Sequence, residues 1–477
     1  MIIISLIKMR NLVASLFAIV LLSGYTELSG QITITEDSVE FGKFGIVHLY
    51  KPNVAPTEVV FFVSGDAGWK YGVIDMAKQL AKKGALVAGI DILHYFKVLK
   101  KDEEKCYYIS ADFESLSQFI QKKYEFDNYQ IPILAGYSSG ATLVYGIIAQ
   151  APNETYKGAI ALGFCPDLEI NKPLCEGSGL KADSIKNGYL LRPRKNMSSI
   201  FIALTGKLDN VCNLQSTQEF MAKLEKSKLY YLPKVGHGFS NQKNWMPQFI
   251  QAYDTICQSV IQQKSQIDTA GLGSLDIKVY PAKKIDNNLP MLIGISGDGG
   301  WRGLVDNMSN GFSEKGVPVV GIDALRYFWK YVSPEKVADD VSKIIVNYTK
   351  VWKKSKVVLM GYSFGANIIP FIIDRLPADI KSKVSMAIML SPDDHADFEF
   401  HFASWLDKSS KDAFPVLPEI LKLNGLKTLV FFGDEEKDPL KHDIPANIAK
   451  IIEVPGDHRY KDDRNKLVAL IMAEIEK

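Results

Sequence analysis

Two nearly identical pentapeptides, 225 positions apart, constrain this chain more than any other feature of its sequence. Residues 136–140 (GYSSG) and residues 361–365 (GYSFG) both have the form G-x-S-x-G. Each follows a short apolar run and leads into an apolar stretch with helical character. The glycines permit a tight strand-to-helix turn that pushes the serine hydroxyl outward. One such motif is weak evidence, but its recurrence in the same context predicts a duplicated domain.

Other blocks repeat in the same order around the two pentapeptides. Residues 64–69 (SGDAGW) match residues 296–301 (SGDGGW), and residues 89–96 match residues 321–328. A histidine preceded closely by glycine, His237 or His458, follows late in each copy. A chain of 477 residues has room for two domains of roughly 200–230 residues, each large enough for its own core.

The apolar runs of each half alternate with helix-like segments. In the first half, we expect strands at 59–63, 86–90, 158–162 and 200–204, with helices at 72–83 and 111–123. In the second half, we expect strands at 291–295, 318–322, 356–360, 385–390 and 428–432. Alternating strands and helices indicate parallel sheets. With the serine turns, the pattern predicts two tandem α/β-hydrolase-type domains, each a mostly parallel sheet with helices on both faces.

The amino terminus has the order of a secretory signal peptide. Lys8 and Arg10 precede an apolar core at 12–22, which is followed by small and polar residues. The core is short for a membrane span, although a retained anchor is the alternative. We therefore expect a signal peptide at 1–30, a first domain at 31–262, a linker at 263–273, a second domain at 274–477, and a periplasmic location.

The net charge and the cysteines of the chain limit the ligands that it is expected to bind. The formal net charge is +2 and the lysines are scattered, so we expect no nucleic-acid partner. None of the five cysteines has C-x-x-C spacing, so zinc is not indicated. We expect neither a metal site nor a cofactor. A disulfide among Cys165, Cys175 and Cys212 is plausible in an exported protein. For Cys106 and Cys257, buried thiols are an equally good reading.

A serine nucleophile needs a base that takes its proton and an acid that orients the base. In this fold the three groups follow one another along the chain as serine, acid and histidine. In the first half these positions are occupied by Ser138, Asp209 and His237. The alternative for the two histidines, His237 and His458, is a packing role in their loops.

The second half offers Ser363 and His458, with a choice of acid between them. Asp438 is our first choice for the acid. Glu436 competes with it, because Glu436 lies three residues past Gly433, as Asp209 lies three residues past Gly206. The sequence leaves both alternatives open.

The SGDxGW blocks follow the strand after which this fold places its oxyanion loop. We expect the oxyanion to be bound by the backbone N–H groups of Asp66 with Ser139, and of Asp298 with Phe364. A tight turn with a packed tryptophan is the alternative reading. The repeated acids Asp91 and Asp323 either cap a helix or hold the following loop.

Four blocks of the second half, at 296–301, 321–329, 361–366 and 391–401, resemble the VirJ family of bacterial virulence proteins. The tandem arrangement resembles the longer AcvB type, which joins a related domain to a VirJ-like one. The resemblance implies an α/β-hydrolase fold, a periplasmic location, a role in virulence and hydrolysis of lysyl-phosphatidylglycerol. It places the family's nucleophile on Ser363. A cysteine expected soon after Asp438 is missing, although the first half has one at Cys212.

Lysyl-phosphatidylglycerol is an aminoacyl ester with a cationic head, and acidic side chains would suit it. We expect the following residues to bind it at the membrane surface: Asp393, Asp394, Asp397, Glu399, Trp301 and Tyr327. A solvated acidic loop is the alternative. Rival functions are a general periplasmic esterase or peptidase, and a non-catalytic docking protein for secreted proteins or an export machine.

Overall fold

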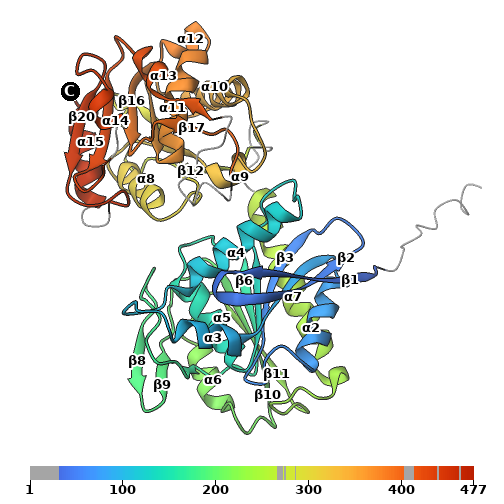
Figure 1. Cartoon of the computed structure of the whole chain (residues 1–477). Coiled ribbons are helices and arrows are strands. Elements are labelled where there is room, and N and C mark those ends of the chain that lie inside the picture. The colour runs from blue at the N-terminus through green and yellow to red at the C-terminus, as the bar shows by residue number, and fades with distance from the viewer. Residues whose placement is uncertain are drawn as a thin grey trace, which may run out of the picture.

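The structure is a computed structural model that describes residues 32–265, 272, 275–284, 286–401, 413–437, 440–460 and 464–477. It contains two large sheets that do not share strands, one in each half of the chain. In Figure 1 the first half, blue to green, lies below the second half, yellow to red. The predicted signal peptide at 1–30 lies outside the described residues.

The first sheet has eight strands, and its central strands are parallel. Its antiparallel edge is a hairpin of β1 and β2, with β2 next to β4. In spatial order the strands are β1 (Ile34–Phe41), β2 (Gly45–Pro52), β4 (Ala85–Ile90), β3 (Glu58–Val63), β5 (Ile133–Tyr137), β6 (Gly158–Leu162), β10 (Ile200–Gly206) and β11 (Ser227–Leu232).

The second sheet repeats this order without an equivalent of β1. Its one antiparallel pair joins β12 to β14 at the edge, and the other pairs are parallel. In spatial order the strands are β12 (Ile277–Tyr280), β14 (Val319–Ile322), β13 (Met291–Ile295), β15 (Val357–Tyr362), β16 (Val384–Leu390), β19 (Thr428–Gly433) and β20 (Lys450–Val454). The two mostly parallel sheets confirm the predicted fold class.

Helices cover both faces of each sheet, because strands that are apolar on both sides need cover on both sides. One face of the first sheet packs against α2 (Gly72–Ala81) and α7 (Met246–Ser265). The other face packs against α3 (Ile92–Leu99), α4 (Ile109–Lys123), α5 (Ser139–Gln150) and α6 (Leu214–Met221). In the second sheet, α8 (Leu304–Glu314) and α15 (Arg464–Ile475) cover one face. The other face carries α9 (Ala324–Tyr327), α10 (Pro334–Val351), α11 (Phe364–Arg375), α12 (Ala378–Lys381), α13 (Leu417–Leu421) and α14 (Leu440–Asp443).

Small elements lie in the loops between the large ones. Three short strands, β7 (Asp167–Leu168), β8 (Ala182–Ile185) and β9 (Gly188–Leu191), form a sheet of their own. Two more, β17 (His395–Ala396) and β18 (Phe414–Pro415), pair in the second half. The 3-10 turns are η1 (Gly42–Phe44) and η2 (Gln242–Asn244).

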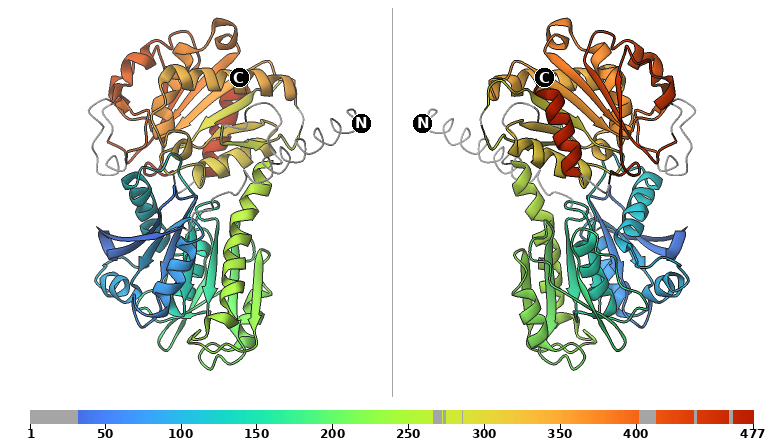
Figure 2. Two further views of the ribbon diagram at one scale, coloured as in Figure 1. Left: turned by 90° about the vertical axis from the view of Figure 1, so that its right-hand side faces the viewer. Right: turned by 90° about the vertical axis from the view of Figure 1, so that its left-hand side faces the viewer.

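The junction between the halves is marked by α7. This helix runs along the first domain toward the second, as Figure 2 shows. It continues to Ser265, three residues beyond the predicted domain end at 262 and into the predicted linker at 263–273. Leu272 packs into the core of the second half. Among the described residues, no helix is both long enough and apolar enough to cross a membrane.

Candidate active sites

Each predicted serine stands at a strained turn between a central strand and a helix. Ser138 joins β5 to α5 with φ 56° and ψ −123°, and Ser363 joins β15 to α11 with φ 51° and ψ −119°. Non-glycine residues rarely adopt this region, and such strain clusters at functional sites. The position two residues after each serine must be glycine, because a backbone carbonyl oxygen approaches it closely. A Cβ on Gly140 would lie 2.4 Å from the carbonyl oxygen of Ser64, and one on Gly365 would lie 2.3 Å from that of Ile295.

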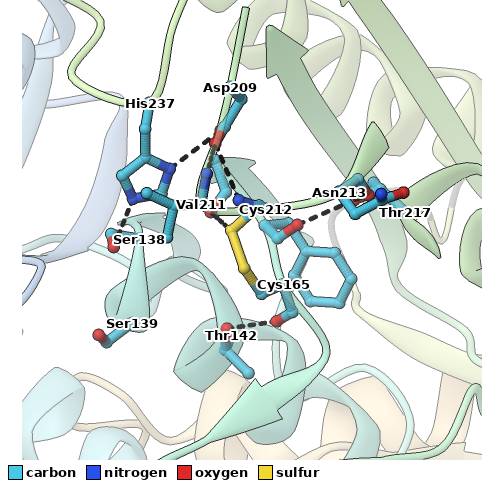
Figure 3. Close-up of a disulfide and its surroundings, with 12 residues drawn as sticks. Ser138, Ser139, Thr142, Cys165, Asp209, Val211, Cys212, Asn213, Thr217 and His237 are labelled. Carbon is cyan, nitrogen blue, oxygen red and sulfur yellow. Dashed lines mark hydrogen bonds and ion pairs between the residues drawn. A yellow bond between two sulfur atoms is a disulfide. The ribbon is translucent and has the colours of Figure 1, made fainter. Parts of the chain in front are cut away.

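In the first half the three predicted residues form a hydrogen-bonded chain, drawn in Figure 3. Ser138 Oγ lies 2.9 Å from His237 Nε2, and His237 Nδ1 lies 2.9 Å from Asp209 Oδ2. The Asp209 side chain is fully buried and His237 is 18% exposed. The other carboxylate oxygen of Asp209 accepts the backbone N–H groups of Val211 and Cys212 at 2.9 and 2.8 Å. The acid is therefore held rigidly by its own loop.

The second half builds the same chain with a glutamate. Ser363 Oγ lies 2.9 Å from His458 Nε2, and His458 Nδ1 lies 3.0 Å from Glu436 Oε2. The acid beside His458 is thus Glu436, and our first choice, Asp438, is corrected. Asp438 itself lies outside the described residues. The shared spacing from Gly206 and Gly433 was the sequence signal that pointed to Glu436.

Glu436 is held differently from Asp209. Its Oε1 accepts the backbone N–H of Gly433 and the hydroxyl of Ser391, the latter at 2.7 Å. Burial acts to raise the pKa of Glu436, but the hydrogen bonds from His458, Gly433 and Ser391 outweigh it and leave that pKa below its usual value. Ser391 also contacts the buried hydroxyl of Tyr460 at 2.6 Å. The carboxylate is therefore ionised and oriented, as the partner of a histidine base must be.

A disulfide lies beside the first triad and has no counterpart beside the second. Cys165 is bonded to Cys212, the residue whose N–H holds Asp209 (Figure 3). Asp209, Cys212 and His237 lie close together, but the sulfur of Cys212 is committed to this bond. A second disulfide joins Cys106 to Cys175, so the buried-thiol reading fails for Cys106. Cys257 is the free thiol, and burial raises its pKa to about 11.

The predicted oxyanion loops lie against the nucleophiles. A Cβ on Gly65 would lie 3.0 Å from the Cβ of Ser138, and one on Gly297 would lie 3.4 Å from the Cβ of Ser363. Ser139 and Phe364 are the first residues of α5 and α11, where a backbone N–H has no acceptor within its helix. In the first loop, the carboxylate of Asp66 also accepts the hydroxyl of Ser139.

The two aromatic residues assigned to substrate binding, Trp301 and Tyr327, make hydrogen bonds within the second domain. Trp301 is 4% exposed, its indole N–H donates to the Tyr280 hydroxyl at 2.9 Å, and its ring fills the space above Gly321. Tyr327 donates its hydroxyl to Asp340 at 2.7 Å, which ties α9 to α10. The assignment of Trp301 is therefore corrected, whereas that of Tyr327, which is half-buried, stays a prediction. Trp69 repeats the role of Trp301 in the first half, because it donates to the Tyr50 hydroxyl and covers Gly89.

The repeated acids after β4 and β14 are helix caps. Asp91 accepts the N–H groups of Leu93 and His94 at the start of α3, and Asp323 accepts that of Arg326 at the start of α9. The capping reading is therefore the correct one.

The acidic side chains of the loop at 393–399 lie in two different environments. Asn367, one turn after Ser363, accepts the N–H of Asp393 at 2.7 Å and donates to the carbonyl of His395 at 2.8 Å. Asp393 and Asp394 are exposed, and Asp397 is half-buried. Although Asp393 as a residue is exposed, its carboxyl group is partly desolvated, and this, together with the neighbouring carboxylate of Asp394, raises the pKa of Asp393.

Glu399 is engaged elsewhere. Its Oε1 lies 2.9 Å from the ammonium group of Lys122, which belongs to α4 in the first half. An ion pair between the domains therefore engages this carboxylate in the structure, and its assignment to substrate binding stays a prediction.

Sequence reasoning missed the tyrosine that precedes each nucleophile. Tyr137 donates its hydroxyl to the carbonyl of His237 at 2.9 Å, and Tyr362 donates to that of His458 at 3.1 Å. Burial raises the pKa of Tyr362 to about 12, so its hydroxyl remains a donor at neutral pH. Each tyrosine fixes the backbone of the histidine loop. The signal was the tyrosine shared by both pentapeptides.

Two serine turns, each with a histidine and a carboxylate in hydrogen-bonded order, together define an α/β-hydrolase-type protein with two candidate active sites. Residues 57–163 and 290–477 match the family model of the bacterial virulence protein VirJ. These segments make up more than half of the chain, which therefore belongs to the VirJ family. Comparison with curated proteins finds no significant match.

Several solved structures are similar to one half of the chain. A putative dienelactone hydrolase from Klebsiella pneumoniae is 13% identical, with a TM-score of 0.34, over 47% of this chain and 99% of its own. Est1E from Butyrivibrio proteoclasticus, bound to ferulic acid, is 16% identical, with a TM-score of 0.33, over 43% and 96%. A cold-adapted esterase from an Arctic intertidal metagenomic library is 15% identical, with a TM-score of 0.33, over 48% and 96%.

Proposed function

We propose that this protein is a periplasmic serine hydrolase whose second site cleaves aminoacyl esters of phospholipid, with lysyl-phosphatidylglycerol as the expected substrate. The observation that carries the proposal is the chain from Ser363 through His458 to Glu436. It supplies a nucleophile, a base within hydrogen-bond reach and an acid that orients the base.

The proposed reaction follows from these positions. His458 takes the proton of Ser363 as its oxygen attacks the aminoacyl carbonyl. The backbone N–H groups of Asp298 and Phe364 receive the developing negative charge. His458 then protonates the lipid alcohol, which leaves, and the aminoacyl group stays on Ser363. A water molecule, deprotonated by His458, releases the free amino acid and restores the serine.

The surroundings of the two nucleophiles favour different acyl groups. Near Ser363, Asn367 holds the loop that carries Asp393 and Asp394. Near Ser138, Thr142 holds the carbonyl of Cys165 in the corresponding loop, and a neutral disulfide stands there instead. An acyl group with ammonium ions suits the acidic surroundings, so we assign the aminoacyl substrate to the second site.

The test uses purified protein and vesicles that contain lysyl-phosphatidylglycerol. We expect release of free lysine, and we expect Ser363→Ala to abolish nearly all of it while Ser138→Ala retains it. An exposed ion pair contributes about 0–1 kcal/mol. Two such pairs amount to at most about 2 kcal/mol, so Asp393→Asn together with Asp394→Asn should reduce kcat/KM on this lipid measurably, by up to about 30-fold, and leave p-nitrophenyl acetate hydrolysis unchanged.

Other outcomes identify the rival functions. Hydrolysis of p-nitrophenyl acetate without lysine release would indicate a general esterase. If a fluorophosphonate probe labels neither Ser363 nor Ser138, the protein is not a serine hydrolase and the docking function is favoured.

A further inference from the structure

In the first domain, α4 and the loop that follows it pack against the edge of the second domain that carries the candidate active site. Four side chains, Tyr129, Leu325, Trp329 and Phe400, form a buried cluster across this contact. The indole N–H of Trp329 donates to the carbonyl of Phe126 at 2.8 Å, and Lys122 donates to the carbonyl of Trp329. Both views in Figure 2 show this part of the first domain meeting the second.

The equivalent edge of the first domain is not covered in the same way. Leu93 holds the position of Leu325 in the repeated block, yet Leu93 is 49% exposed and Leu325 is 2% exposed. This contact is therefore specific to the second domain and does not follow from the fold.

One residue connects this interdomain contact to the candidate oxyanion loop. Arg302 follows Trp301 directly, and its Nε donates to the carbonyl of Gly299 inside that loop at 2.6 Å. Its other nitrogens reach the first domain, where Nη1 donates to the Thr155 hydroxyl at 2.7 Å and Nη2 pairs with Glu114 of α4. The side chains of Arg302 and Glu114 are only 13% and 15% exposed.

The two oxyanion loops are thus anchored by different means. In the first domain, Ser139 donates its hydroxyl to Asp66 in the loop, and the residue equivalent to Arg302 is the exposed Lys70. In the second domain the residue after the nucleophile is Phe364, whose side chain has no group that could donate such a bond. The second loop is held instead by the guanidinium of Arg302, which donates to the carbonyl of Gly299.

We propose that the first domain is the positioning element of the second active site, and that Glu114 acts through Arg302 to hold the oxyanion loop against Ser363. Glu114 is a positioning residue, since it contacts neither the nucleophile nor the histidine in the structure. The inference rests on the proposed hydrolase activity of the second site. Burying this ion pair is costly unless both partners are present, so removal of one should release the other from its place.

The test measures p-nitrophenyl acetate hydrolysis in a Ser138→Ala background, where Ser363 carries the activity. Because an oxyanion donor acts in the transition state, Glu114→Gln should lower kcat and leave KM nearly constant. Loss of one donor costs roughly 10²–10³ in kcat, and a displaced donor should cost less, about 10-fold to 100-fold. Glu114→Asp, which keeps the charge, should recover part of the loss.

The matched control is Glu154→Gln. Glu154 pairs with Lys278 across the same interface, but neither contacts the oxyanion loop. It should therefore leave kcat within about 2-fold of the parent. A second control is fluorophosphonate labelling of Ser138 in the otherwise unmodified Glu114→Gln protein, which should be normal and so show that the first domain is folded.

Unchanged kcat in Glu114→Gln would overturn the inference, and so would an equal loss in Glu154→Gln. Failure of Ser363 to react with the probe in the unmodified protein is a separate outcome. It would refute the proposed hydrolase function itself.

Discussion

The disulfide between Cys165 and Cys212 should affect catalysis at the first site and not at the second. The perturbation is the double substitution Cys165→Ala and Cys212→Ala. It removes the covalent tie on the segment whose N–H groups hold Asp209. His237 then loses the fixed acid that sets its orientation, whereas Glu436 depends on Ser391 and Gly433.

The double substitution should lower both the stability of the first domain and the reactivity of Ser138. The bridge closes a loop with a sequence separation of 47 residues, for which chain entropy gives about 4 kcal/mol of stabilisation. That is a large share of the roughly 5–15 kcal/mol of a typical domain. The reactivity of Ser138 should fall by no more than about 10⁴, which is the loss in rate when the triad acid does not function at all. We expect Ser138 to react with a fluorophosphonate probe at least ~10-fold more slowly.

The second disulfide supplies a matched control. Cys106 and Cys175 are 69 residues apart, so Cys106→Ala with Cys175→Ala should also cost about 4 kcal/mol, but this bridge does not touch the triad. The assay is urea unfolding together with mass spectrometry of the labelled Ser138 and Ser363 peptides. If both double variants slow labelling of Ser138 equally, or if Ser363 slows as much as Ser138, the disulfide acts through stability alone and the reasoning is refuted.

Two further predictions concern the second triad and the location of the protein. Glu436→Gln should reduce turnover at Ser363 by about 10³–10⁴, because His458 loses the partner that fixes its tautomer. Asp438→Asn should stay near the parent rate. The reverse pattern in steady-state kinetics would return the acid role to Asp438. The mature protein should begin near Gln31 and be released by osmotic shock, as two disulfides suit an oxidising compartment; intact residues 1–30 found by mass spectrometry in a membrane fraction would contradict this.

The central strands could be predicted because they are apolar on both faces. The expected strands at 158–162 and 291–295 coincide with β6 and β13. The edge strands were missed for the same physical reason. β1 has one buried residue among eight, and β20 has one among five, so neither shows a continuous apolar run.

The serine turns and histidines could be placed from the repeat, because strained turns need glycine at fixed positions. The acid of the second triad could not be settled, since two carboxylates in one loop differ only in three-dimensional position. Trp301 was misassigned because a repeated block can serve packing as well as chemistry, and its side chain is buried. The bond from Arg302 to Glu114 joins residues 188 positions apart, and no local pattern reports such a partner.

The cluster formed by Tyr129, Leu325, Trp329 and Phe400 bears on how the two halves behave when separated. A second domain produced alone would present a leucine, a tryptophan and a phenylalanine to water, and contiguous apolar surface of this kind promotes aggregation. Joining both halves in one chain keeps the partner at a high effective concentration. Proteolysis between the halves should therefore yield fragments that stay associated, and poor solubility of the isolated second half would reflect its lost partner and not a defect in its own fold.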